Sequence, residues 1–208
     1  MARIEINWVT TDHISIFEEA RELGFDLRKF KYQNKNVQNA MKKSTVDSII
    51  KKIRDRWVDE NIEFKDIKNG VYIISICDGF CVKYTNFPSE IMYIGRGSIS
   101  NRIRSHLANW IFEMSLSLRD APFKFYMTRV GDSRSPNAFK DFEHYLLETF
   151  NSKFGEKPLI NKIGGRLGKV DHTYSGEYIK PLDNRGKNYF WEIRPTERNK
   201  WFKRVEDE

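Results

Sequence analysis

The sequence predicts an α+β protein, and two changes in its hydrophobic pattern support this fold class. Before Gly70 the apolar residues recur at helical spacing, whereas GVYIISI begins a region of β-branched and aromatic runs that is typical of strands. An amphipathic helix, a further strand and a second amphipathic helix are expected after these runs. The 208 residues suit one medium-sized domain, or a core with an extension on each side.

The N-terminal third is expected to be helical. ISIFEEARELGFDLRKF predicts one helix that is interrupted near Gly24, and KYQNKNVQNAMKK is polar enough to be partly loop. STVDSIIKKIRDRWVDENI has a clear helical period, and Ser44 followed by Asp47 resembles a capping box with a shorter acid. The apolar face of this helix consists of Val46, Ile49, Ile50, Ile53 and Trp57.

The central region is expected to contain the strands. GVYIISI forms the first one, Asp78-Gly79 turns the chain, and FCVKY returns as the second arm of a hairpin. IMYIG and FKFYMTRV predict two further strands, separated by a helix that begins at about Ser100. The last helix is expected to start at Ser135-Pro136, which suit a cap and a first turn, and to end before Gly155.

The composition favours a polyanionic partner. The formal net charge is +7 and the pI is about 9.3. The excess of basic residues is spread along the chain, except that the window 28–56 combines ten basic residues with two acids, Asp47 and Asp55. This window can contact a phosphate backbone, or it can be the solvated face of a helix. Its basic residues are Arg28, Lys29, Lys31, Lys35, Lys42, Lys43, Lys51, Lys52, Arg54 and Arg56.

The cysteines and the hydropathy favour a soluble cytoplasmic protein. Cys77 and Cys81 are expected to be buried free thiols, with a disulfide as the alternative. A zinc site would need two further ligands, and the four histidines are scattered along the sequence. No run of 18 apolar residues is present and the N-terminus lacks a signal-peptide pattern, so we expect no membrane association.

Several polar residues occupy positions where apolar ones are usual. Glu143 has Phe139, Leu146 and Phe150 at helical spacing, so its carboxylate needs a partner, a proton or a metal ion. The alternative is a place at the edge of the apolar stripe, where the carboxylate reaches water or pairs with a lysine.

Two further pairs of residues share this property. Arg102 and His106 are four residues apart on one helix face, where they overhang a site at the strand end or form an exposed pair. Tyr72 and Tyr93 lie in β runs, and either belongs in the core by default. If their strands pair, both hydroxyls can project from one face of the sheet.

Taken in order, these residues resemble the motifs of the GIY-YIG nuclease family. The match consists of GVY at 70–72, YIG at 93–95, R-x-x-x-H at 102–106, the helical Glu143 and the asparagine of PLIN, Asn161. The likeness covers about residues 67–163, with GVY in place of GIY. The two tyrosines are 21 residues apart (93 − 72), and the extra length is assigned to an extended CDGFCVKYTNFPSE hairpin. The resemblance implies a small three-stranded antiparallel sheet flanked by helices, and hydrolysis of DNA phosphodiesters.

The resemblance also implies roles for individual residues. Glu143 would bind Mg²⁺ or Mn²⁺, Arg102 would hold a phosphate oxygen, and Tyr72 would accept a proton from water. A tyrosine does so only when positive charge lowers its pKa, and the metal, Arg102 and His106 are the candidate sources. Tyr93 and His106 would orient water and phosphate. The implied catalytic set is Tyr72, Tyr93, Arg102, His106, Glu143 and Asn161.

The expected organisation is a GIY-YIG core (67–163) between two extensions. Residues 1–66 would be a helical extension for DNA contact or dimerisation, and residues 164–208 a basic, aromatic extension of irregular structure. Candidate DNA contacts are Arg96, Arg104, Lys51, Lys52, Arg166 and Lys169.

The expected function is a metal-dependent endonuclease of restriction type that cuts double-stranded DNA at a specific sequence in a bacterial or phage-infected cell. Double-strand cleavage with one site per chain implies a homodimer or sequential nicking. The alternative is a phage, homing-type or structure-specific enzyme of the same family. A further alternative is a non-catalytic nucleic-acid-binding module on the same fold.

Overall fold

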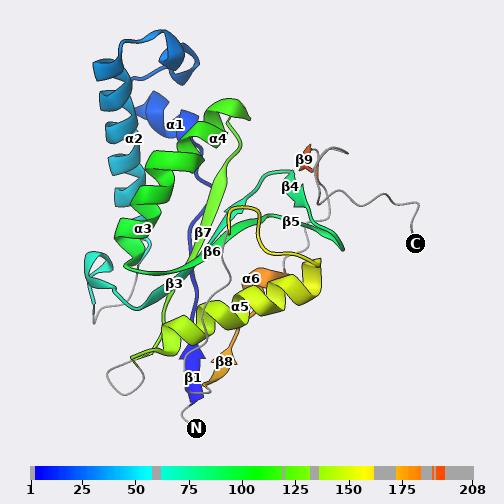
Figure 1. Ribbon diagram of the computed structural model, residues 1–208. Helices are drawn as coiled ribbons and strands as arrows, with labels where there is room; N and C mark the ends of the chain where they lie inside the picture. The colour runs from blue at the N-terminus through cyan, green and yellow to red at the C-terminus, as the bar shows by residue number, and fades with distance from the viewer. Residues whose placement is uncertain are drawn as a thin grey trace, which may run out of the picture.

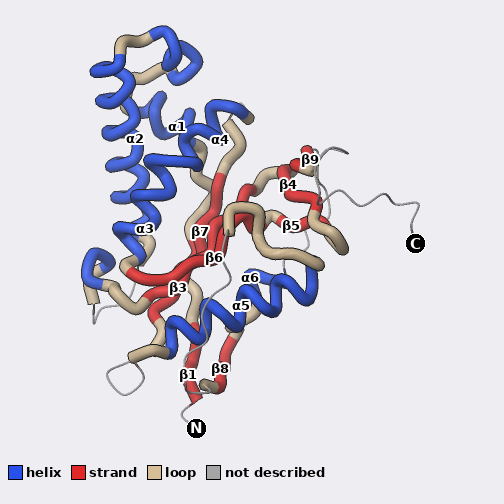
Figure 2. Tube along the Cα trace, in the orientation of Figure 1, coloured by secondary structure: helices blue, strands red, loops and turns tan. Residues whose placement is uncertain are grey.

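The computed structural model has the α+β fold that the sequence predicts. It describes residues 3–57, 62–118, 120–131, 136–161, 172–183, 189 and 191–194. A central antiparallel sheet lies between two groups of helices, with the N-terminal helices gathered beyond one of its ends (Figures 1 and 2).

The central sheet is antiparallel and has four strands. Their order is β2 (Val9–Thr10), β7 (Phe123–Arg129), β3 (Gly70–Ile76) and β6 (Ile91–Gly97). Every residue of β3 is buried, because the strand lies between β6 and β7 and is covered on both faces. The three long strands correspond to predicted ones, but the sheet is not the expected three-stranded one. The N-terminal segment adds β2, which is too short to show an alternating pattern in the sequence.

Helices cover both faces of this sheet. One face is covered by α3 (Ile99–His106), a π-helical turn η3 (Leu107–Ile111) and α4 (Phe112–Ser117), which follow one another without a break. The other face is covered by α5 (Ala138–Phe154), which contacts β3 and β6. The predicted helix end at Gly155 is confirmed by its positive φ of 82°. The helix begins at Ala138, and the expected cap at Ser135 lies outside the described residues.

The N-terminal helices are only partly as predicted. The interruption at Gly24 is confirmed, since its φ of 82° separates α1 (Ile16–Glu22) from the 3-10 helix η1 (Leu27–Tyr32). The polar segment 31–43 was expected to be partly loop, but only Gln33 and Asn34 are, because α2 (Lys35–Asp55) already begins there. Asn34 caps α2 by accepting a 3.0 Å hydrogen bond from the Val37 amide, so the capping box at Ser44 is wrong. A short 3-10 helix, η2 (Phe64–Asp66), leads into β3.

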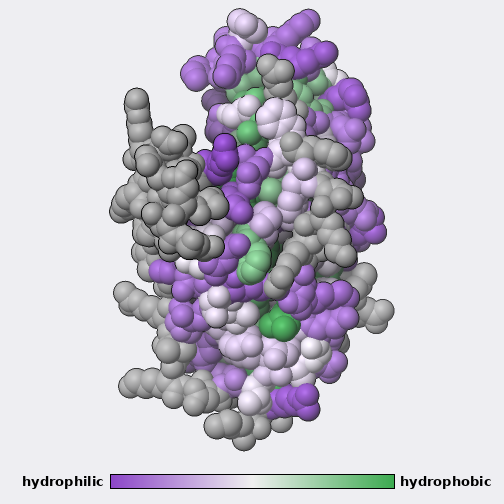
Figure 3. Space-filling view, turned by 90° about the vertical axis from the view of Figure 1, so that its right-hand side faces the viewer, coloured by the Kyte–Doolittle hydropathy of each residue, from purple (hydrophilic) through white to green (hydrophobic). Residues whose placement is uncertain are grey.

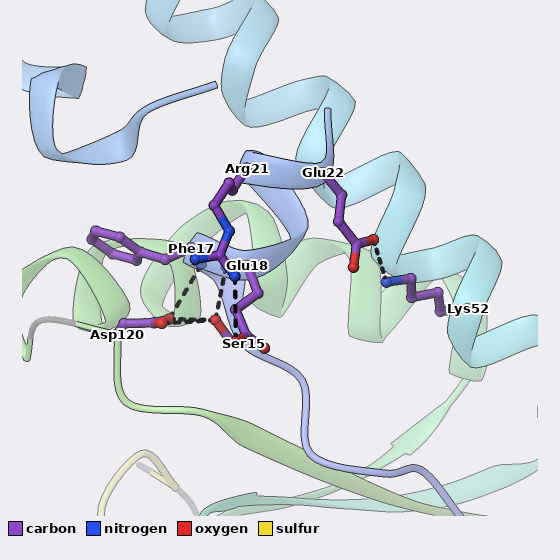
Figure 4. A network of polar contacts seen from close by, with 7 residues as sticks. All are labelled: Ser15, Phe17, Glu18, Arg21, Glu22, Lys52 and Asp120. Carbon is purple, nitrogen blue, oxygen red and sulfur yellow. Dashed lines mark hydrogen bonds and ion pairs between the residues drawn. The ribbon is translucent and has the colours of Figure 1, made fainter. Parts of the chain in front are cut away.

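An Asp120-centred network ties α1 to the chain that enters β7 (Figure 4). The Ser15 hydroxyl donates to the Asp120 carboxylate at 2.7 Å, and the Phe17 amide donates to it at 3.2 Å. Ser15 also caps α1 by accepting from the Glu18 amide at 2.9 Å. Asp120 therefore holds the first turn of α1 next to the chain that enters β7, although Ser15 and Asp120 are far apart in the sequence.

The peripheral strands differ from the prediction. Positive φ angles at Asp78 and Gly79 confirm the turn, but β4 (Phe80–Lys83) does not return along β3. It cannot do so, because β6 and β7 already occupy both edges of β3. Instead β4 pairs with β5 (Pro88–Ser89) and with β9 (Trp191–Ile193).

The described parts of the C-terminal extension are more regular than predicted. In addition to β9, they contain β8 (Thr173–Gly176), which pairs in parallel with β1 (Arg3–Ile6), and a short helix α6 (Lys180–Asp183). Both strands of this extension pair with segments from other parts of the chain, so their existence depends on long-range contacts.

The two cysteines and the surface follow the prediction in part. Cys77 and Cys81 are free and buried, as expected. In the described part of the chain, no helix has the length and apolar character needed to cross a bilayer. Figure 3 shows hydrophilic side chains over most of one face, with apolar ones in small patches between them.

We predict that Gly155→Ala destabilises the protein more than Gly24→Ala does. Both glycines have a φ of 82°, where alanine costs about 1–2 kcal/mol. At Gly24 an added Cβ meets nothing within 4 Å, whereas at Gly155 it would lie 2.8 Å from the Cβ of Thr85. We therefore expect an additional loss of about 1–3 kcal/mol for Gly155→Ala, measured by urea unfolding. Equal losses for the two variants would contradict this packing.

Candidate active site

The two motif tyrosines lie together on one face of the sheet, as predicted. Tyr72 on β3 is opposite Gly95 on β6, and Tyr93 is two residues before Gly95, so both side chains project from the same face. Their ring centroids are 6.0 Å apart. A Cβ at Gly95 would lie 2.7 Å from the Tyr72 hydroxyl and 2.4 Å from Cε1 of Tyr93. The glycine of YIG thus leaves the space that both rings occupy.

Gly70, the glycine of GVY, also leaves space for a neighbouring side chain. A Cβ at Gly70 would lie 2.2 Å from Cγ1 of Ile99, the first residue of α3. The missing side chain lets the start of α3 pack closely on the start of β3. This close packing brings the rest of α3, with Arg102 and His106, over the tyrosine face.

His106 joins the two tyrosines from α3. Its Nε2 atom is 2.9 Å from the Tyr72 hydroxyl oxygen, and its ring centroid is 4.4 Å from that of Tyr93. On its other side, Nδ1 accepts a 2.8 Å hydrogen bond from the indole N–H of Trp110. Trp110 is not among the site residues expected from the sequence. The signal for its contact is its spacing of four residues from His106.

Burial controls the protonation of this aromatic group. It lowers the pKa of His106 to about 4, and the charge of Arg102 acts in the same direction, so the imidazole is neutral at pH 7. Burial also raises the pKa of Tyr72, with Tyr93 acting in the same direction and Arg102 opposing. His106 is therefore not the source of positive charge that the sequence analysis considered for Tyr72. Tyr72 itself has no exposed surface.

Arg102 is the cation nearest to the tyrosines. Its side chain is exposed and lies against the hydroxyls of Tyr72 and Tyr93. The pKa of Arg102 is raised, and the largest cause is the negative charge that Tyr72 carries when it is ionised. Arg104, two residues along α3, turns away and pairs with Asp47 of α2. Of these two arginines, only Arg102 borders the site.

Glu143 and Arg96 form an ion pair on the other face of β6. Arg96 is opposite Val71, one position away from the Tyr72–Gly95 pair, so it points away from the tyrosines. Its Nε atom is 3.1 Å from the Glu143 carboxylate, which has a side-chain exposure of 12%. The partner that the buried position of Glu143 requires is thus an arginine of the neighbouring strand, and not a lysine or water.

The charges around Glu143 are not fully matched. Burial raises the pKa of this carboxyl, while Arg96, Arg102 and His144 oppose the shift in that order. The Nη1 atom of Arg96 is buried and has no hydrogen-bond partner, which is costly for a charged donor. Arg102 therefore acts on both faces of β6, since its charge affects Tyr72 on one side and Glu143 on the other.

Asn161 lies along the outer edge of β6. Its side-chain oxygen accepts from the Ile94 amide at 2.9 Å, and its side-chain nitrogen donates to the Ile94 carbonyl at 2.7 Å. The adjacent Ile160 amide donates to the Met92 carbonyl at 3.0 Å. The PLIN segment thus continues the hydrogen bonding of the sheet beyond its edge strand. These contacts position the backbone on both sides of Tyr93.

Three of the four candidate DNA contacts that the structure describes are paired with acids. Lys52 pairs with Glu22 at 2.8 Å, as Figure 4 shows, and also with Glu19 at 2.6 Å. Arg96 and Arg104 pair as described above. Lys51 is exposed and makes no ion pair within the described ranges. Arg166 and Lys169 lie outside the described residues. The other ion pairs of the basic window are Arg28–Asp26, Lys42–Glu113, Arg54–Asp55 and Arg56–Asp12.

Glu143 fits a magnesium or manganese ion in one respect. Such ions are often bound through one or two carboxylates, with the remaining positions filled by substrate phosphates and water. Glu143 supplies one nearly buried carboxylate beside the partly buried Arg96, and the charge of the exposed Arg102 also reaches it, which suits a site that is completed by a phosphate. The ion would compete with Arg96 for this carboxylate.

A second group of possible metal ligands lies elsewhere. His13, Cys77 and Asp78 place one ligand atom each within 4.8 Å of one another, so one histidine lies beside a cysteine that is distant in the sequence. Each member also has a protein partner: His13 pairs with Asp78 at 2.5 Å, and the Cys77 thiol donates to the Pro122 carbonyl at 3.3 Å. The mixture of thiol, imidazole and carboxylate does not suit magnesium.

Comparisons with models of protein families, with curated proteins and with solved structures gave no match for this chain. The chemistry of the site is therefore inferred from its geometry. An exposed guanidinium, two tyrosines, a neutral imidazole and a nearly buried carboxylate surround the end of β6. This combination can bind an oxyanion and move a proton next to it.

We predict that His106 makes the protein less stable in mild acid. Between pH 6.5 and about 4 the unfolded chain binds a proton at His106 that the folded protein does not bind. Stability that is present at neutral pH is lost as the pH falls through this window, by up to about 3 kcal/mol. Urea unfolding at pH 7 and pH 4.5 measures the loss, which His106→Gln should reduce. His13→Gln, at an exposed histidine, should keep it. An unchanged pH dependence in His106→Gln would contradict the buried neutral imidazole.

Proposed function

We propose that this protein is a metal-dependent endonuclease of the GIY-YIG type that hydrolyses phosphodiester bonds of double-stranded DNA. The observation that supports the proposal most is the convergence of residues from five separate sequence motifs. Tyr72, Tyr93, Arg102 and His106 gather on one side of β6, and Glu143 reaches Arg96 on the other. Asn161, from the fifth motif, PLIN, forms hydrogen bonds with the backbone of the same strand.

In the proposed reaction, Arg102 binds a non-bridging oxygen of the scissile phosphate. Its exposed planar guanidinium suits this contact, and it stabilises the charge that develops when water attacks phosphorus. The attacking water loses a proton to the ionised hydroxyl of Tyr72 as its oxygen bonds to phosphorus. The bond from phosphorus to the leaving oxygen breaks, and this oxygen takes a proton from solvent water. A Mg²⁺ or Mn²⁺ ion held by Glu143 would supply further positive charge for the phosphate.

The proposal requires a small rearrangement around Tyr72. Its side chain has no exposed surface, and burial raises its pKa, so water does not reach an ionised Tyr72 in the described conformation. Arg102 lies against the Tyr72 hydroxyl and is itself exposed. A shift of Arg102 towards a bound phosphate would open this hydroxyl to water.

The restriction-type interpretation is the more specific part of the proposal. One site per chain cuts both strands only as a homodimer or by two successive nicks. Phage, homing-type and structure-specific enzymes share the same chemistry, and the ends of the cleavage products distinguish them. Five of the ten basic residues of window 28–56 are paired with acids. The other five are exposed and make no ion pair within the described ranges, so they remain candidates for a phosphate contact: Lys29, Lys31, Lys35, Lys43 and Lys51.

A non-catalytic nucleic-acid-binding module is the second candidate. It is favoured by the buried Tyr72 and by the direct Arg96–Glu143 pair, both of which suit a structural role for motif residues. Such a module would bind DNA without cutting it. Cleavage and binding are therefore measured on the same variants.

We predict that Glu143→Gln abolishes metal-dependent cleavage. The protein is incubated with plasmid and phage DNA with Mg²⁺, with Mn²⁺ or with EDTA, and the product ends are mapped. Loss of the carboxylate should reduce the rate by about a hundredfold or more, since it removes the charge that holds the metal. Glu148→Gln, at an exposed position of the same helix, should cleave like the wild type.

The outcomes separate the candidates. Discrete fragments with Mg²⁺ support a sequence-specific endonuclease, and a smear supports a nuclease without the restriction role. Binding without cleavage of any duplex, branched or single-stranded DNA rejects the enzyme and leaves the binding module. Full activity of Glu143→Gln would mean that Glu143 is not the metal ligand.

We predict that Arg102→Ala loses cleavage while Arg104→Ala keeps it. Both arginines are on α3, but only Arg102 borders the tyrosines, while Arg104 is held by Asp47. Removal of a charge that is positioned on a reacting phosphate lowers the rate by about 100- to 1,000-fold. Single-turnover cleavage with saturating protein measures this effect without the contribution of binding. Equal losses in both variants would mean that Arg102 only attracts DNA through its charge and does not contact the reacting phosphate.

A further inference from the structure

We infer that Trp110 is a positioning residue that fixes the tautomer of His106, so that the Nε2–H group of His106 donates to the hydroxyl oxygen of Tyr72. The inference deepens the proposed function. Its predicted effect on the cleavage rate rests on that function, whereas the tautomer does not. The tautomer itself follows from hydrogen bonds on both sides of the imidazole.

The first step concerns the indole of Trp110. An indole N–H group can only donate a hydrogen bond, and in Trp110 it is 2.8 Å from Nδ1 of His106. Nδ1 must therefore accept, so it carries no proton. A neutral imidazole has one proton, which then lies on Nε2.

The second step concerns Tyr72. Its hydroxyl oxygen is 2.9 Å from Nε2, and a protonated Nε2 makes this oxygen the acceptor. Tyr72 consequently cannot pass its own proton to His106. His106 is thereby excluded as a base that acts through Tyr72, and it becomes a donor that stabilises negative charge on the Tyr72 oxygen.

The surroundings keep the imidazole neutral. Arg102 approaches His106 from the same helix, and Tyr93 approaches it from β6. The positive charge of Arg102 disfavours a second proton on His106. Glu143 and Arg96 lie on the opposite face of β6 and pair with each other. Trp110 thus meets an imidazole with a free lone pair on Nδ1.

Two features hold the indole in place. Trp110 lies in the π-helical turn η3 that directly follows His106, and turns of this kind are frequent at functional sites. Its ring packs edge-on against Phe123 of β7, with centroids 5.9 Å apart. Phenylalanine at position 110 keeps this aromatic packing and removes only the N–H donor, which makes it the informative substitution.

The test is the ¹⁵N NMR spectrum of the histidine side chains in the full-length protein, recorded at pH 7.5 without DNA or metal. His106 is assigned with His106→Gln. The wild type should show His106 with the proton on Nε2 alone, and Trp110→Phe should show a mixture of tautomers. Trp57→Phe is the matched control, since Trp57 also packs on a phenylalanine and donates its N–H, but to the Ile62 carbonyl.

A His106 protonated on Nδ1 in the wild type would overturn the inference, and so would an unchanged Nε2 tautomer in Trp110→Phe. In a cleavage assay, the loss of one hydrogen bond should lower the single-turnover rate of Trp110→Phe by about three- to tenfold, with no change in DNA affinity. An unchanged rate despite mixed tautomers would reject the role in positioning. If the wild type cuts no DNA, the proposed function fails while the NMR result still decides the tautomer.

Discussion

The pairing of Tyr72 with Gly95 between β3 and β6 is the constraint on which the candidate site depends. Tyr72 on the central strand can lie over the edge strand only because position 95 has no side chain; a Cβ there would lie 2.7 Å from the tyrosine hydroxyl. A slip of one residue in this register would turn Tyr93 to the other face. It would also bring Arg96 onto the face that now holds the tyrosines. The Asn161 side chain secures this register from outside, because it bonds both backbone groups of Ile94.

Local pattern was enough to predict the elements that carry the site. Strands β3, β6 and β7 and helices α3 and α5 have strong periodicity, so their positions followed from the residues themselves. The shared face of Tyr72 and Tyr93 needed only strand alternation and the assumption that the strands pair. The polar start of α2 was missed because its helical signal is weak and its cap, Asn34, stands ten residues before the more obvious Ser44. This start is mostly exposed and is fixed by side-chain hydrogen bonds rather than by apolar packing: Asn34 caps the helix, and Gln38 donates to the carbonyl of Phe30.

Other features depend on contacts between distant segments, which one sequence does not encode locally. Strand β2 has two residues, and β8 and β9 exist through pairing with β1 and β4. The partner of Glu143 was open among water, a lysine and a metal, because the register that brings Arg96 to it was unknown. Five of the ten basic residues of window 28–56 pair with acids, and these acids include Asp12, Glu19 and Glu113, which lie outside the window. Charge counted along the chain therefore overstated the local field.

The charges around β6 also explain why the proposed reaction needs a metal. Burial raises the pKa of both Tyr72 and Glu143, and Arg102 is a cation that opposes both shifts. A phosphate that binds Arg102 brings negative charge to the same place, which raises the pKa of Tyr72 further and works against its ionisation. Arg96 cannot compensate, since its charge is already paired with the carboxylate of Glu143. A neutral His106 contributes a hydrogen bond but no charge. For Tyr72 to accept a proton while phosphate is bound, the proposed reaction requires a further cation, and Glu143 is the ligand that we propose for it.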